Sequence, residues 1–248
     1  MMRWRWIIQI VMSIFILFLQ GCSTDSEPKT VIFYSPHADD ESLSFGVAIR
    51  NYLHKHSQVH LVLLSDGRKS GAFKQIKQAA KNKVSAKDFP NLRIHDFQKA
   101  SSALGIDQQK QHIHHLENGR FQLSKVKEII LQYEKKYPQS MHISFSEVDM
   151  QKDHVVVGKA LNQLKQNKQI HHKQNYISLA TIYYSKLKVP PYKKETLLNV
   201  DDAVYITHAL KVYETWNPKK GFYKTGGFSV PEQFQIAHQE HFNRVSLY

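Results

Sequence analysis

The segment VIFYSPHADDE, residues 31–41, carries the clearest indication of fold and function in this chain. Its first half, residues 31–35, is a nearly continuous apolar run with β-branched members, which is typical of a strand buried on both faces. Its second half places His37, Asp39 and Asp40 directly after that strand. Because ligands of open α/β sheets bind outside the carboxyl ends of the strands, these side chains are well placed to form a functional site.

The segments that follow continue the pattern of an α/β protein. Residues 41–54 carry apolar side chains at near-helical spacing, and residues 59–65 form a second apolar run. A strand, a helix and a strand joined by connections this short imply a right-handed crossover and a parallel sheet. We therefore predict an α/β fold, a Rossmann-like three-layer sandwich with a mostly parallel sheet.

The rest of the chain alternates between helix and strand patterns. Its 248 residues suit one domain, which we place at residues 30–248. Residues 69–90 are a polar, lysine-rich insertion for which the sequence predicts no element. We expect helices over residues 94–104, 123–137 and 155–164, and strands over residues 141–145 and 176–185.

The first 21 residues resemble a bacterial lipoprotein signal peptide. Arg3 and Arg5 precede an apolar stretch of about 14 residues, which is short for a membrane-spanning helix of roughly 20. The stretch ends in LQGC, residues 19–22, which resembles the lipobox at which the signal is cut before a cysteine that carries lipid. The alternative is an uncleaved signal anchor that ends in an incidental cysteine.

This resemblance implies an anchored protein. Residues 1–21 would be the signal peptide, Cys22 the lipidation site and residues 22–29 a polar tether. We expect the domain to be held at the extracytoplasmic face of the cell membrane by its lipid. Because Cys22 is the only cysteine, an intrachain disulfide is excluded.

The charge balance is strongly basic. A formal charge of +13 falls to about +11 once the two arginines of the signal peptide are removed. Such a surface favours anionic neighbours, which outside the cytoplasm are lipid headgroups and anionic envelope polymers. The lysines are scattered and no nucleic-acid module surrounds them, so we expect no nucleic-acid partner. The alternative to an anionic partner is a solvated basic face that binds nothing.

His37 and Asp40 can converge on one metal ion, because they lie three residues apart in a turn that enters a helix. Asp39 would then point towards a metal-bound water. The best third ligand is His154, which follows the predicted strand at residues 141–145 and opens another helix at the same sheet edge. Imidazole and carboxylate ligands suit zinc. The alternative is that residues 37–41 form only a polar turn that caps a helix.

These segments together resemble the PIG-L or LmbE-like family of metal-dependent N-acetylglucosamine deacetylases, over about residues 31–164. The first family motif is His-Pro-Asp-Asp-Glu after the first strand, here at residues 37–41, and the second is His-Pro-Asp-His, here at residues 151–154. Residues 93–105 resemble the family's Arg-x-x-Glu helix, with Asp96 in place of glutamate, and residues 65–67 match a polar turn after the second strand.

The resemblance implies a role for each matching residue. A divalent metal, zinc or iron, would be held by His37, Asp40 and His154, with Asp39 as the general base. Glu41 is expected to orient the loop or cap the helix, and Asp153 to orient a neighbouring polar group. The resemblance further implies that Arg93 contacts hydroxyls or phosphate of the substrate, with a solvated helix start as the alternative. The substrate would be an acetamido sugar.

Two residues depart from the family pattern. Ala38 replaces the usual proline, which only relaxes the loop. Gln151 replaces the first histidine of the second motif, which by the resemblance acts as oxyanion stabiliser or acid. Glutamine can donate a hydrogen bond but cannot deliver a proton as imidazolium does. Histidines that could substitute for it are His112, His114, His115 and His142.

The sequence therefore predicts a metal-dependent amide hydrolase that removes the N-acetyl group from an N-acetylglucosamine-containing envelope glycan, glycolipid or glycoconjugate. Gln151 keeps open a second class, a lipoprotein that binds sugar on the same fold without turnover. The basic surface keeps open a third class, a module that binds anionic polymers and in which residues 37–41 have no role.

Overall fold

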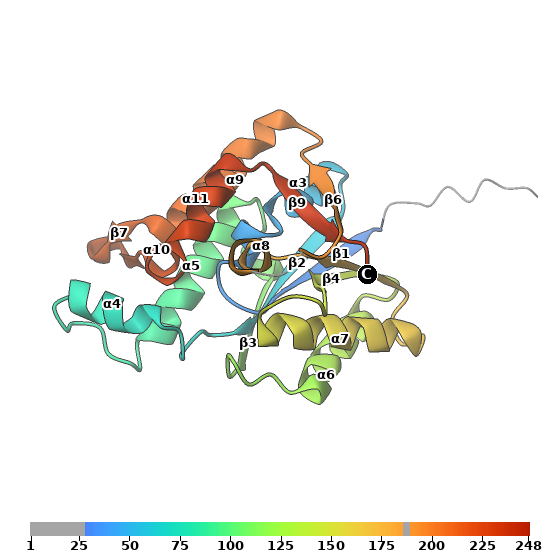
Figure 1. The fold of residues 1–248 in the computed structure, drawn as a ribbon, viewed down its shortest axis with the longest axis horizontal. Coiled ribbons are helices and arrows are strands. Elements are labelled where there is room, and N and C mark those ends of the chain that lie inside the picture. Colours follow the sequence, from blue (N-terminus) through green and yellow to red (C-terminus); the bar gives the residue numbers. More distant parts are fainter. Residues whose placement is uncertain (1–27, 186–188) are drawn as a thin grey trace, which may run out of the picture.

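The computed structural model describes residues 28–185 and 189–248. The predicted signal peptide, Cys22 and most of the predicted tether lie outside these residues. Within them, no helix combines the length and the apolar character needed to cross a membrane. The described chain folds into a central sheet with helices on both faces, so the predicted α/β three-layer sandwich is confirmed (Figure 1).

The sheet has seven strands in the order β3-β2-β1-β4-β5-β9-β6. Strands β1 to β5 run parallel to one another, and β9 runs antiparallel to both β5 and β6. The sheet is therefore mostly parallel, as predicted. The strands are β1 (Thr30–Ser35), β2 (Gln58–Ser65), β3 (Gln111–Leu116), β4 (Met141–Phe145), β5 (His172–Tyr176), β6 (Tyr192–Thr196) and β9 (Phe242–Ser246).

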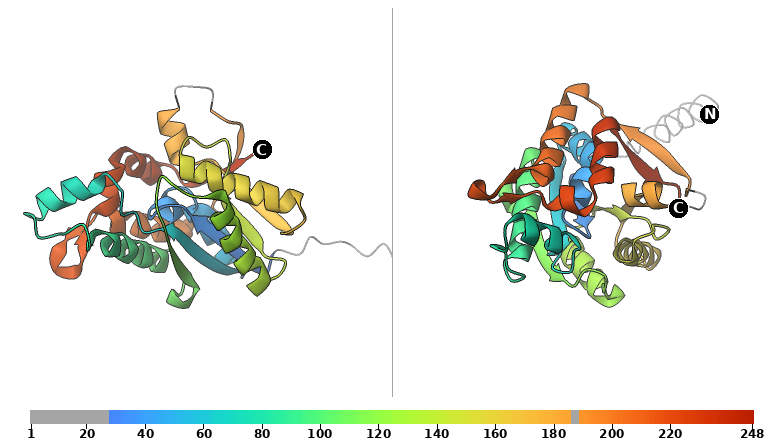
Figure 2. Two further views of the ribbon diagram at one scale, coloured as in Figure 1. Left: turned by 90° about the horizontal axis from the view of Figure 1, so that it is seen from below. Right: turned by 60° about the vertical axis from the view of Figure 1, so that its left-hand side comes forward.

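Two helical layers cover the sheet because alternate side chains of the buried strands point to opposite faces. Phe33 and Leu61 face one layer, whereas Ile32 and Val62 face the other. Figures 1 and 2 show these layers on either side of the sheet. The first layer contains α3 (Gly46–His54), α5 (Phe89–Ala103) and α9 (Ala203–Glu214), and the second contains α6 (Leu123–Lys136) and α7 (Lys152–Gln166).

Shorter elements surround the carboxyl edge of the sheet. The lysine-rich insertion forms a helix, α4, which packs on the small helix α10. Residues 216–223 form a two-stranded hairpin. These elements are α2 (Asp40–Leu43), α4 (Ala72–Ala79), α8 (Leu179–Tyr184), β7 (Trp216–Asn217), β8 (Phe222–Tyr223), α10 (Thr225–Ser229) and α11 (Pro231–Gln239), with short 3-10 turns at Gln108–Lys110, Val200–Asp202 and Pro218–Lys220.

Three expectations from the sequence were wrong in detail. The helix predicted over residues 41–54 is two helices, because the chain leaves helical geometry at Ser44 and Phe45, where the Phe45 ring stacks on Phe145 at 4.6 Å. The strand predicted over residues 176–185 is mostly helix α8, which the Ser178 hydroxyl begins by accepting a hydrogen bond from the Thr181 amide. The helix predicted from residue 94 begins five residues earlier, at Phe89.

Helix α7 lies unusually close to the loop after β4. A side chain at Gly158 would place its Cβ 2.4 Å from the backbone nitrogen of Glu147, so only glycine permits this packing. The close contact holds the first turn of α7 against the carboxyl end of β4. That turn carries Asp153 and His154.

Candidate metal centre

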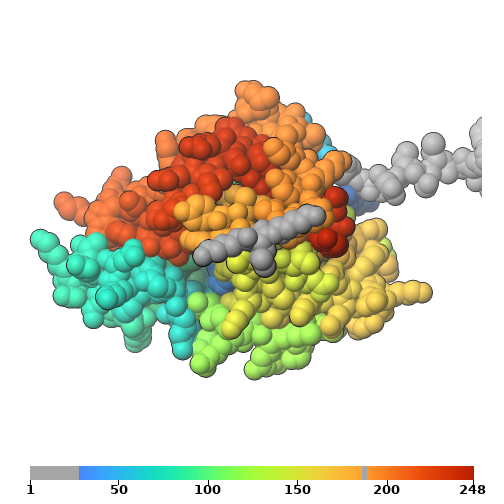
Figure 3. Space-filling model, viewed as in Figure 1, coloured from blue at the N-terminus to red at the C-terminus, as the bar shows by residue number. Residues whose placement is uncertain are grey.

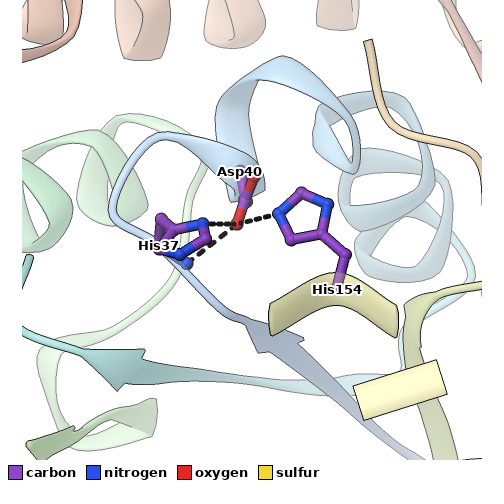
Figure 4. A group of neighbouring side chains, drawn as sticks. All are labelled: His37, Asp40 and His154. Atoms are coloured by element: carbon purple, nitrogen blue, oxygen red, sulfur yellow. Dashed lines mark hydrogen bonds and ion pairs between the residues drawn. The ribbon is translucent and has the colours of Figure 1, made fainter. Parts of the chain in front are cut away.

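The site lies where the strand order reverses. Strand β1 has β2 on one side and β4 on the other, so the connections that leave β1 and β4 turn away from each other and open a crevice at the carboxyl edge. His37 lies in the turn after β1, Asp40 begins α2, and His154 lies in the first turn of α7, after β4. Figure 4 shows both imidazole rings flanking the Asp40 carboxylate.

The three side chains have the spacing of metal ligands. Asp40 Oδ2 is 3.6 Å from His37 Nδ1 and 3.4 Å from His154 Nε2, and one ligand atom from each residue lies within 4.8 Å of the others. Tetrahedral zinc with bonds of about 2.0–2.1 Å separates its ligand atoms by about 3.3 Å. The residues predicted to bind metal are therefore brought together at distances that suit one ion.

His154 supplies a second indication of a metal site. Its side chain is fully buried, and its Nε2 atom has no hydrogen-bond partner among the described residues. Leaving a buried polar atom without a partner costs about 1–3 kcal/mol. The donor set and this unpartnered nitrogen, directed at Asp40, both fit a divalent cation.

A carboxylate lies behind each imidazole ring. His37 Nε2 is 3.0 Å from Asp153 Oδ2, and His154 Nδ1 is 3.0 Å from Asp149 Oδ1. These contacts leave His37 Nδ1 and His154 Nε2 facing Asp40, the arrangement by which metal-binding histidines are held in one orientation. The prediction that Asp153 orients a polar neighbour agrees with this geometry.

Asp149 was missed by the sequence reasoning. Its carboxylate is buried and also accepts hydrogen bonds from the backbone amides of Gln151 and Ser178, so it joins the start of α7 to the start of α8. The only signal in the sequence was a carboxylate five residues before His154, in the loop that precedes the helix.

The carboxylates set the charge of the two histidines. Burial acts to lower the pKa of His154, but Asp40 and Asp149 outweigh it and raise that pKa to about 10. Burial also acts to lower the pKa of His37, but hydrogen bonds to Asp153 and Asp40 outweigh it and raise that pKa above its ordinary value. The same contacts hold the pKa of Asp40 well below its usual range, against the effect of burial. A concentrated negative charge of this kind attracts a cation.

Asp39 is not part of the three-residue ligand group, and its carboxylate contacts Arg93. Its φ of 122° lies in a region that a non-glycine residue adopts at a cost of about 1–3 kcal/mol, so the surrounding contacts must hold it there. Arg93 supplies one of them, because its guanidinium lies 3.4 Å from Asp39 Oδ2 and donates to the Ala38 carbonyl at 2.5 Å. Burial raises the pKa of Asp39 to about 6, although Arg93 opposes the rise.

Glu41 anchors the loop, which agrees with its predicted role. Its carboxylate accepts a hydrogen bond from the Asp39 backbone amide at 3.2 Å and one from the Tyr213 hydroxyl at 2.7 Å. Burial raises the pKa of Glu41 to about 8, although the Tyr213 hydrogen bond opposes the rise. Tyr213 thereby fixes the position of the loop from α9, more than 170 residues further along the chain.

A pocket of about 170 Å³ opens beside these side chains. In the space-filling view a small blue area of the amino-terminal part of the domain is visible where the teal, green and orange parts of the surface meet (Figure 3). Its lining joins segments from across the chain: His37, Asp39, Asp40, Gly67, Ser70, Arg93, Asn118, Gln151, Ser229, Val230 and Gln233.

The pocket lining tests two predictions. Gln151 lines the pocket, in the position predicted for it. The histidines suggested as substitutes, His112, His114, His115 and His142, are not among its lining residues, so that suggestion was wrong. His142, for example, is buried between Glu134 and the Tyr34 hydroxyl, beneath α6.

The sequence matches the family described as GlcNAc-PI de-N-acetylase, PIG-L, over residues 32–165, which is more than half of its length. The chain belongs to the PIG-L family. This PIG-L protein is accordingly an amide hydrolase of the N-acetylglucosamine deacetylase type, with a candidate metal site of two histidines and an aspartate. No curated protein matches the sequence.

Solved structures share the fold of this PIG-L protein at low identity. The pseudoaglycone deacetylase Dbv21 is 14% identical with a TM-score of 0.63, over 86% of this chain and 89% of its own. The N,N′-diacetylchitobiose deacetylase of Pyrococcus horikoshii is 14% identical with a TM-score of 0.55, over 82% and 80%. The hydratase GalB of Pseudomonas putida is 13% identical with a TM-score of 0.56, over 89% and 96%, so the fold alone does not determine the reaction.

Proposed function

We propose that this PIG-L protein removes the N-acetyl group from an N-acetylglucosamine unit of an envelope glycan, glycolipid or glycoconjugate. The observation that carries the proposal is the grouping of His37, Asp40 and His154 beside a pocket lined by Asp39, together with a buried His154 Nε2 that has no hydrogen-bond partner among the described residues. A bound divalent ion would supply a Lewis acid for the acetamide carbonyl and make water at the site more acidic.

Asp39 is the proposed general base. With a pKa of about 6 it is ionised at neutral pH, yet basic enough to accept a proton from the water that attacks the carbonyl carbon. Within residues 28–185 and 189–248, no histidine other than His37 lines the pocket, so Asp39 would also return this proton to the nitrogen as the amide bond breaks. The products are acetate and the free amine of the sugar.

Other residues around Asp39 have supporting roles in this proposal. The Gln151 amide can donate a hydrogen bond to the oxygen that becomes negative, but it cannot supply a proton. Asp153 holds the His37 ring. Arg93 lines the pocket, and its buried Nε atom has no partner among the described residues, which leaves one donor for a substrate hydroxyl or phosphate.

Zinc is the proposed metal, because two imidazoles and a carboxylate with an open position form a typical catalytic zinc set. Iron(II) is the second candidate, since the metal found in the cell depends on availability as well as on ligands. Measuring the metal content of protein purified from its native cells would distinguish the two.

We propose that lipid on Cys22 attaches the protein to the extracytoplasmic face of the cell membrane. The described chain begins beside the amino end of β1, where the Pro28 carbonyl accepts a hydrogen bond from Ser57. The metal centre lies at the carboxyl end of the same strand, so a short tether would leave the site facing away from the bilayer. This arrangement favours an envelope glycan over a glycolipid of the same membrane, and the basic surface would hold anionic polymers nearby.

The test is release of acetate from N-acetylglucosamine compounds by residues 30–248, with added zinc, with chelator, and in the Asp39→Asn variant. Release that requires metal and is lost in the variant is expected. Absence of release from every compound by a protein that holds one metal ion would instead support the second candidate, a lipoprotein that binds sugar without turnover, which Gln151 favours.

A further inference from the structure

A buried amide faces the pocket and is not explained by the reaction. Gln233, in the first turn of α11, is only 4% exposed and lines the pocket beside Ser229 and Val230. Its Nε2 atom is buried and has no hydrogen-bond partner among the described residues. An amide nitrogen offers two donors and no acceptor, and leaving it without a partner costs about 1–3 kcal/mol.

The packing around Gln233 fixes the position of helix α11. The next residue, Phe234, is fully buried and packs on Tyr213 with ring centroids 6.0 Å apart. A Cβ on Gly226 would lie 2.5 Å from the Phe234 ring, so α10 and α11 meet without space for adjustment. Because Tyr213 also holds Glu41, this wall of the pocket is tied to the loop that carries Asp39 and Asp40.

The other lining side chains indicate what Gln233 would bind. Amides and hydroxyls contribute much of the lining, from Ser70, Asn118, Gln151 and Ser229, and no lysine of the described part of the chain contributes to it. Such groups suit the neutral hydroxyls of a sugar ring, which donate and accept hydrogen bonds together. An anionic group would find fewer free cations here, because Arg93 already contacts Asp39 and Ala38.

We propose that Gln233 is a substrate-binding residue whose Nε2 donates a hydrogen bond to a ring hydroxyl oxygen of the acetamido sugar. This inference rests on the proposed function and adds a contact on the wall formed by α10 and α11. In the free protein the amide nitrogen of Gln233 has no acceptor among the described residues, and the bound substrate would supply one. Loss of that one neutral hydrogen bond corresponds to about a tenfold change in affinity.

The experiment compares Gln233→Met with the wild-type protein, using N,N′-diacetylchitobiose as the probe. Methionine matches glutamine in length and packs in apolar surroundings, so it removes the donor without opening a cavity. We expect KM to rise about tenfold with little change in kcat, and the melting temperature to stay the same or increase. The matched control is Gln235→Met on the exposed side of α11, which should change neither KM nor melting temperature.

Calorimetry of the metal-free proteins with the same probe gives a second readout that does not depend on turnover. The affinity should weaken by the same factor in Gln233→Met. An active wild-type protein whose Gln233→Met variant keeps its KM and its affinity would overturn this inference alone. A lower melting temperature with unchanged KM would assign Gln233 to the fold and overturn it too. A metal-loaded wild-type protein that neither binds nor hydrolyses any acetamido sugar would overturn the proposed function and this inference with it.

Discussion

Two groups of histidines in this protein have opposite electrostatic character. At the carboxyl edge of the sheet, Asp40 and Asp149 contact His154 and raise its pKa to about 10 against the effect of burial. Near the amino ends of β2 and β3, His60 lies against His112 and Tyr137, and burial lowers the pKa of His60 to about 4. One group attracts cations, whereas the other stays neutral because a charge there would be neither hydrated nor paired.

The difference lies in the neighbours and not in burial, since His60 and His154 are both almost inaccessible to solvent. His154 has a carboxylate on each side, whereas the Nδ1 of His60 contacts only another imidazole, His112 Nε2, at 3.1 Å. A buried histidine thus becomes a candidate metal ligand only where carboxylates converge on it.

The largest effect is expected from His154→Ala, which removes one of three ligands. The purified variant should contain no stoichiometric metal and release no acetate, while circular dichroism shows a folded protein. The control from the other group is His112→Gln, which should keep both metal and activity. One retained metal ion per chain in His154→Ala would contradict the three-ligand site.

Asp39→Asn should keep the metal and lose the base. We expect kcat to fall by about 10²–10⁴-fold, the range that a general base contributes, with metal content unchanged. Single-turnover kinetics and metal analysis on the same sample measure both quantities. An active Asp39→Asn variant would move the base to another residue.

Asp149→Asn tests whether carboxylates distinguish the two groups. The variant keeps the size of the side chain at position 149 but removes its negative charge. His154 then loses the contact that orients its ring and raises its pKa. Metal affinity should fall about 10- to 100-fold, which competition with a chelating dye can measure. Asp153→Asn should act in the same way through His37, and no change in either variant would refute the role given to these carboxylates.

The smallest effect concerns stability as a function of pH. The folded-state pKa of His60 lies below its ordinary value of 6.5, so its contribution to stability is complete above that value and is lost as pH falls towards 4. Between pH 7 and pH 5 the loss is on the order of 2 kcal/mol. His60→Leu should reduce the pH dependence of the free energy of unfolding, measured by urea denaturation, by this amount, with the exposed His54→Leu as control. An unchanged pH dependence would show that His60 does not titrate in this way.

Much of the site could be predicted because its residues lie at the ends of recognisable strands. Strand β4 has the predicted bounds, and β1 and β2 each begin one residue earlier than expected. His37, Asp40 and His154 come directly after two of these strands, so a parallel sheet brings them together. Tyr213 and Gln233 were missed because their roles depend on residues in distant segments. Asp149 was missed because no local pattern shows that a carboxylate five residues before His154 contacts its ring.

The wrong helix and strand boundaries have a similar origin. Residues 176–185 contain the apolar and aromatic side chains that strands favour, but this preference is weak and the Ser178 cap outweighs it once Asp149 holds the segment. The break at Phe45 allows its ring to stack between sheet and helices, which no local pattern reveals.

By itself, the sequence determined the mostly parallel sheet, the metal-ligating residue types and their positions after β1 and β4, because periodicity and turns depend on neighbours along the chain. Only the tertiary structure decided which histidines are charged, which carboxylates hold them, and that Gln233 lines the pocket. Those properties depend on distances between residues up to two hundred positions apart, and packing alone sets such distances.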